Sequence, residues 1–71
     1  MKLLRKDIPT AALNNANLAL LQKRGMPKAG AYRQILQNWW LEEYDILVQD
    51  NWSSLMFKSE QAYTMFILKW S

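Results

Sequence analysis

The chain has 71 residues, 51% of them hydrophobic and 13% aromatic, with nine basic and six acidic side chains and no Cys or His. This length allows a single small domain, 1–71, with little area to bury, so a partner is expected to support it. The absence of Cys and His excludes disulfides, Cys/His zinc sites and histidine general bases.

Two helices are predicted after a basic N-terminal arm at residues 1–9. Ile8 should be extended because it precedes a proline, and Thr10 can cap the helix that follows. Apolar residues then recur at helical spacing. Gly25, with a proline two residues later, marks a helix end, so the first helix is predicted over 10–24.

The second helix is predicted over 27–43, with a proline tolerated in its first turn. Large apolar residues recur there at intervals of three and four. Leu36 and Trp39 are expected to face the core. Trp40 then lies about 100° further round the helix and is expected to be exposed, together with Tyr44 one turn later.

The periodicity changes after the second helix. Residues 45–49 and 53–57 are short β-prone runs, and Asp50-Asn51 between them is a turn pair, so a hairpin is predicted. A helix that continues through Val48 is the alternative interpretation.

The last elements are a short helix over 59–66, begun by Ser59 and an acidic first turn, and a strand over 67–70. The predicted fold is therefore a small α+β domain of order α-α-β-β-α-β. Two N-terminal helices pack on a three-stranded sheet, and a short helix precedes the last strand. The predicted core consists of Leu13, Leu20, Ile35, Leu36, Trp39, Ile46, Val48, Leu55, Phe57, Phe66 and Leu68.

The C-terminal stretch contains a distinctive series of residues: Phe57, Glu60, Ala62, Met65, Phe66, Leu68, Lys69 and Trp70. This series resembles a segment of small uncharacterised proteins of tailed bacteriophages. The resemblance implies a phage origin, a location in the host cytoplasm or the virion, and a strand–helix–strand end. It implies no particular activity.

Charge and tryptophan are unevenly distributed along the chain. Residues 1–33 carry seven basic side chains and one acidic, whereas residues 34–71 carry two basic, five acidic and all four Trp. Such asymmetry favours an anionic partner for the N-terminal half. Charge pairing between the two halves of the molecule is the alternative explanation.

Patterns typical of catalysis and cofactor binding are missing from the sequence. Glu42, Glu43 and Asp45 form the one acidic cluster, and neighbouring helical residues point in different directions. There is no glycine-rich nucleotide-binding motif. The uncharged runs fall far short of the ~20 residues that span a membrane, and no secretory leader is seen. We therefore expect a non-enzymatic protein without metal, cofactor or membrane partner.

The aromatic content indicates binding instead. Four Trp, three Tyr and two Phe exceed what so small a core can hide, and Trp and Tyr are common interface anchors. The main hypothesis is a protein-interaction module, part of an oligomer or complex, whose partner is a host protein, a virion subunit or another copy. Its predicted surface has Trp40, Tyr44 and Trp52 as anchors and a charged rim of Arg24, Lys28 and Arg33.

A nucleic-acid-binding protein is the alternative hypothesis. Seven basic residues lie in the arm or around the turn between the predicted helices: Lys2, Arg5, Lys6, Lys23, Arg24, Lys28 and Arg33. Against it, the second helix carries Glu42 and Glu43. Basic and aromatic residues are also segregated in the sequence, whereas single-strand binders interleave them. Binding that weakens steeply with salt would favour this alternative.

Overall fold

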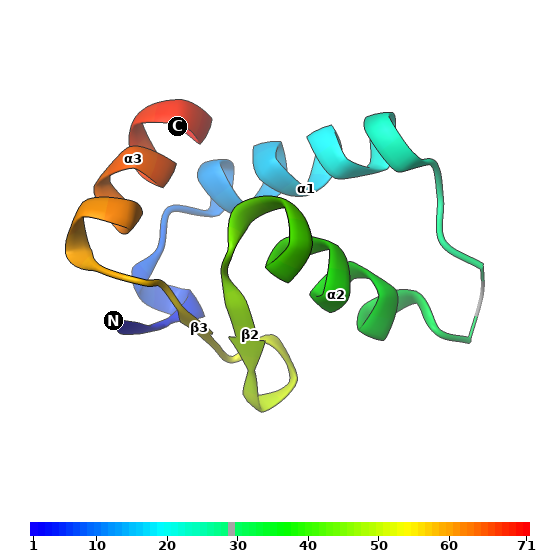
Figure 1. Ribbon diagram of the computed structural model, residues 1–71, viewed down its shortest axis with the longest axis horizontal. Helices are drawn as coiled ribbons and strands as arrows, with labels where there is room; N and C mark the ends of the chain where they lie inside the picture. The colour runs from blue at the N-terminus through cyan, green and yellow to red at the C-terminus, as the bar shows by residue number, and fades with distance from the viewer. Residues whose placement is uncertain (29) are drawn as a thin grey trace.

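Three α-helices and a three-stranded antiparallel sheet make up the computed structural model, which describes residues 1–28 and 30–71 (Figure 1). The predicted class, a small α+β domain, is confirmed. The elements in chain order are β1 (Lys2–Leu4), the 3₁₀ turn η1 (Arg5–Asp7), α1 (Thr10–Arg24), α2 (Tyr32–Tyr44), β2 (Leu47–Gln49), the 3₁₀ turn η2 (Asp50–Trp52), β3 (Ser54–Met56) and α3 (Glu60–Trp70).

The predicted order of elements is wrong at the N-terminus, because a strand precedes the helices. Within the predicted basic arm, Lys2–Leu4 pair with β3, which lies in the middle of the sheet order β1-β3-β2. The Met1 ammonium donates to the carbonyl of Phe57 at 2.5 Å, and the Phe57 amide donates to the Met1 carbonyl at 2.8 Å. With three residues, the alternation of β1 is too short to be recognised among its charges.

The predicted hairpin is confirmed, and the continuous helix through Val48 is wrong. Strands β2 and β3 pair antiparallel on either side of η2. Helix α2 ends because Asp45 adopts the left-handed conformation, with φ of 60°, and its amide caps the helix at the carbonyls of Leu41 and Trp40. A short acidic side chain tolerates this conformation better than most residues.

The predicted final strand is wrong, because α3 continues to Trp70. The helix begins as predicted, with the Ser59 hydroxyl accepting from the Ala62 amide at 3.1 Å. Residues 67–70 alternate, but they also extend a helical stripe of buried and half-buried rings and aliphatic chains: Tyr63, Phe66, Ile67 and Trp70. No glycine or proline follows Ser59 to end the helix earlier.

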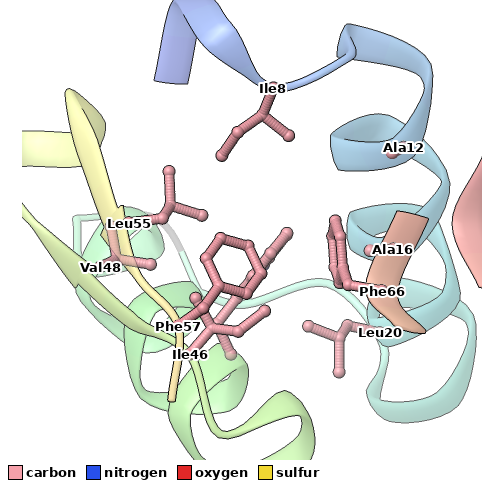
Figure 2. Packing of buried hydrophobic residues seen from close by; sticks show 10 residues of the cluster. Ile8, Ala12, Ala16, Leu20, Ile46, Val48, Leu55, Phe57 and Phe66 are labelled. Carbon is pink, nitrogen blue, oxygen red and sulfur yellow. The ribbon is translucent and has the colours of Figure 1, made fainter. Parts of the chain in front are cut away.

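The core lies between the three helices and the sheet, and side chains from α1, α3 and the sheet meet there with Trp40 of α2 (Figure 2). Helix α1 packs on α3, and α2 packs on β2. Seven predicted core residues are buried: Leu20, Leu36, Ile46, Val48, Leu55, Phe57 and Phe66. Leu13, Ile35 and Trp39 are half-buried. Leu68 is 76% exposed, so its assignment to the core is wrong.

Helix α2 buries Trp40 and not Trp39, the reverse of the prediction. Its inward stripe runs at intervals of four through Leu36, Trp40 and Tyr44, and Trp40 is 1% exposed. The Trp40 indole Nε1 donates to Asn17 Oδ1 at 3.0 Å, which satisfies its one polar atom. Trp39 lies to the side, where the Arg24 guanidinium stands 5.3 Å from the ring centroid.

Candidate functional site

Burial of Trp40 divides the predicted aromatic surface into two separate parts. Its ring lies edge-on to Tyr44 at 5.2 Å and to Trp52 at 5.6 Å, measured between centroids. Tyr44 and Trp52 therefore flank a ring that solvent does not reach. The prediction that Trp40 is an exposed anchor is wrong, because a side chain enclosed by its own domain has no surface to offer a partner.

Tyr44 lies beside a hollow on the α3 side of the domain. Its hydroxyl donates to the carbonyl of Ala16 at 2.5 Å, and its ring lies 5.5 Å from that of Trp70. Burial, with a smaller contribution from the negative charge of Glu43, raises the pKa of Tyr44 to about 12. The phenol therefore stays protonated and acts as a structural donor.

The hollow at Tyr44 has a volume of about 320 Å³ and is also lined by Met65 and Trp70. Met65 is 67% exposed and Leu68, one turn further along α3, is 76% exposed. We term Tyr44, Met65, Leu68 and Trp70 the α3 surface.

Of the two lysines beside the α3 surface, one is in an ion pair and the other lies over an aromatic ring. Lys58 pairs with Asp45 at one end of the hollow. Lys69 Nζ stands 5.1 Å from the centroid of the Trp70 ring, a cation–π contact. What the α3 surface offers a partner is therefore mainly apolar.

Trp52 lies on the opposite side of Trp40, in a strained turn. Asp50, Asn51 and Trp52 all have positive φ, at 50°, 53° and 74°. A positive φ is unusual for any non-glycine residue and more unusual for a bulky one such as Trp. Backbone strain of this kind is often found at functional sites.

Contacts from four elements hold this turn in place. The Ser54 hydroxyl donates to Asp50 Oδ2 at 2.9 Å, and Lys2 Nζ lies 3.5 Å from the same oxygen. From α2, Arg33 donates to Asn51 Oδ1 at 3.2 Å. The Arg5 amide donates to the carbonyl of Ser53 at 2.9 Å. The position of the turn therefore depends on β1, η1, α2 and β3 together.

Two adjoining hollows, of about 250 and 510 Å³, open beside this turn and share several lining residues. They lie between η1, the first half of α1 and the start of α2. We term them together the cationic groove, lined by Arg5, Lys6, Tyr32, Arg33 and Trp52. Tyr32 is 37% exposed and Trp52 is half-buried.

The predicted site residues are thus distributed over several places. Trp52 and Arg33 come together in the cationic groove, whereas Tyr44 belongs to the α3 surface. Lys28 is exposed and lines neither. Arg5 and Lys6 were not predicted beside Trp52, because only the unrecognised strand β1 brings the N-terminus to this turn. Tyr32, also not predicted there, reaches the groove from the first turn of α2.

Arg24 belongs to an ion-pair cluster between the ends of α1 and α2. It donates to Glu42 at 3.0 Å and to Glu43 at 2.8 Å, and Lys23 bonds Glu43 at 2.5 Å. Charge pairing within the molecule, the alternative explanation of the charge asymmetry, therefore accounts for these two basic residues.

Two lowered carboxyl pKa values predict acid sensitivity. Hydrogen bonds from Lys23 and, to a smaller extent, from Arg24 lower the pKa of Glu43. The hydrogen bond from Ser54, followed by the positive charge of Lys2, lowers the pKa of Asp50. Because the folded-state values lie below the ordinary ones of 4.5 and 3.8, stability is present above those values and is lost as the pH falls. We therefore expect the melting temperature to decrease as the pH is lowered from 4.5.

Melting curves recorded at decreasing pH test this expectation. The double variant Glu43→Gln/Asp50→Asn should melt lower at neutral pH and lose less stability on acidification. An unchanged acid decline in that variant would mean that other carboxyls cause it.

Comparison of the chain with protein-family models, curated proteins and solved structures finds no match. Across residues 1–28 and 30–71, every helix is too short or too polar to cross a membrane. The same residues contain no group of three or more Cys, His, Asp or Glu arranged to hold a metal ion.

Proposed function

We propose that the protein is a small non-catalytic interaction module that docks on another protein through the α3 surface. The observation that carries this proposal is the exposure of two large apolar side chains one turn apart on α3, Met65 at 67% and Leu68 at 76%. The resemblance to phage proteins favours a host protein or a virion subunit as the partner.

The two residues belong to a face that a helix normally leaves polar. The opposite face of α3 packs Phe66 into the core, so the core needs neither Met65 nor Leu68. Isolated exposed apolar residues are common, but these two are neighbours one turn apart on the helix, and Met65 lines the hollow together with Tyr44 and Trp70. Aromatic rings beside adaptable Met and Leu side chains suit an apolar segment of a partner.

The state of the carboxylates supports a non-catalytic role. Four of the six acidic side chains are in ion pairs: Glu42, Glu43, Asp45 and Asp50. A carboxylate held by a Lys or Arg is a weak general base, and the sequence has no His or Cys.

Charge substitutions on α3 test the docking proposal. A photo-crosslinking residue at position 68 should crosslink a defined protein in infected cells or virions. Met65→Glu/Leu68→Glu should abolish this partner's binding, because losing central anchors commonly costs about 2 kcal/mol or more. The melting temperature of the double variant should stay near that of the wild type, since both substituted residues are exposed.

The matched control is Leu18→Glu, which places one negative charge on an exposed apolar residue of α1. It is compared with the single variant Leu68→Glu as well as with the double variant. Leu18→Glu should leave partner binding intact. Equal loss of binding in Leu18→Glu and Leu68→Glu would contradict the proposal. Sedimentation of the wild type identifies self-association, the outcome in which the partner is a second copy.

A further inference from the structure

The cationic groove differs from the α3 surface in its charge. Its basic side chains are Arg5, Lys6 and Arg33, and no Asp or Glu is among the described residues that line it. The ion pairs of the described chain involve other basic residues: Lys2, Lys23, Arg24 and Lys58. Much of the positive charge that the fold leaves unpaired is therefore gathered at one groove.

Aromatic rings lie among these cations. Tyr32 adjoins Arg33 in sequence and lines the same hollow as Trp52. Trp52 is held on one side by the buried Trp40, 5.6 Å away, and stands in a turn that Arg33 itself secures through Asn51. Basic and aromatic residues that are segregated in the sequence are thus interleaved in space.

Three asparagine amides add hydrogen-bonding groups to the groove. Asn17 and Asn51 use their side-chain oxygens to accept from Trp40 and Arg33, which leaves the amide N–H groups as donors. The Asn14 amide makes no side-chain hydrogen bond within the described residues. Amides of this kind pair with the edges of unstacked bases.

We propose that the cationic groove binds single-stranded nucleic acid, with phosphates at Arg5, Lys6 and Arg33 and a base against Trp52. Cations and stacking rings in one groove are the combination that single-strand binding requires. An acidic peptide would use the cations but would leave the amides and rings without specific partners. This inference concerns a surface distinct from α3 and is independent of the proposed docking function.

The test uses fluorescence anisotropy with labelled single-stranded DNA and RNA of mixed sequence, each about 12 nucleotides long. The wild type should bind at low salt and lose affinity as salt rises, because phosphate contacts release counterions. Arg5→Ala/Lys6→Ala should weaken binding about tenfold or more. It should also reduce the slope of the logarithm of affinity against the logarithm of salt concentration by about 1.4, since each of the two lost single-strand phosphate contacts contributes about 0.7.

The matched control is Lys28→Ala/Lys69→Ala, which removes two positive charges outside the groove. It should change the affinity little. Equal weakening in the two double variants would overturn the proposal, because the attraction would then come from net charge alone. Absence of oligonucleotide binding by the wild type at about 50 mM salt would also overturn it.

A direct readout on the wild-type protein avoids dependence on any variant's folding. On titration with the DNA, the NMR signals of the Trp52 indole and the Asn14 amide should shift, whereas those of Leu68 on α3 should not. Shifts confined to α3 would overturn the assignment. A Glu-rich peptide that binds more tightly than the oligonucleotides and displaces them would assign the groove to an acidic protein segment instead.

Discussion

Replacing Trp40 by alanine is expected to cost about 3–5 kcal/mol of folding free energy and to leave the protein largely unfolded. The ring is 1% exposed and lies within 6 Å, between centroids, of Tyr44, Trp52 and Phe66. Its removal opens a cavity among them and leaves the Asn17 side chain without its indole donor. A domain of this size has little stability to spare.

Trp39→Ala is the matched control, because it truncates the same residue type one position away. Trp39 is half-buried and its described cation–π partner is the exposed Arg24, so the cost should be about 1 kcal/mol. Urea unfolding followed by circular dichroism measures both. Equal stability of the two variants would show that the inward stripe of α2 is misassigned.

Phe66→Ala is expected to have an effect of the same size as Trp40→Ala. Phe66 is 6% exposed and contacts the rings of Trp40, Tyr44 and Phe57, so it joins α3 to α2 and to the end of β3. Loss of a buried phenylalanine costs about 3–5 kcal/mol. The variant should have a strongly lowered melting temperature or fail to fold.

Leu68→Ala provides the comparison on the same helix. At 76% exposure it has almost no buried area to lose, so its stability should stay within about 0.5 kcal/mol of the wild type. Thermal melts of both variants distinguish the helix seen here from a terminal strand, in which alternate residues would share a face. A large destabilisation by Leu68→Ala would support the strand.

The sequence predicted those features that local chemistry determines. Gly25 and the cap at Ser59 mark helix ends, and the turn at Asp50-Asn51 marks the hairpin. Local chemistry does not determine which of Trp39 and Trp40 is buried. Both fit an apolar stripe with Leu36, and only the position of α2 relative to α1 and the sheet, a tertiary property, decides between them.

The candidate sites were harder to predict for the same reason. Trp52 and Arg33 were recognised as binding residues, but their neighbours Arg5 and Lys6 reach them only through β1, whose pairing partner is more than fifty residues away. Nothing local marks that pairing. Leu68 likewise belongs to the predicted core, and only the continuation of α3 to Trp70 places it with Met65 on the exposed side of that helix.

The central place of β3 in the sheet has a consequence for how the chain folds during synthesis. Strand β1 is made before its pairing partner β3, so Leu3 cannot pair until Leu55 has been synthesised. Contacts between such distant segments form late and slow the folding of small domains. On the ribosome, the sheet and the cationic groove beside it therefore assemble only after β3 has emerged, and helices α1 and α2 precede them without a completed core.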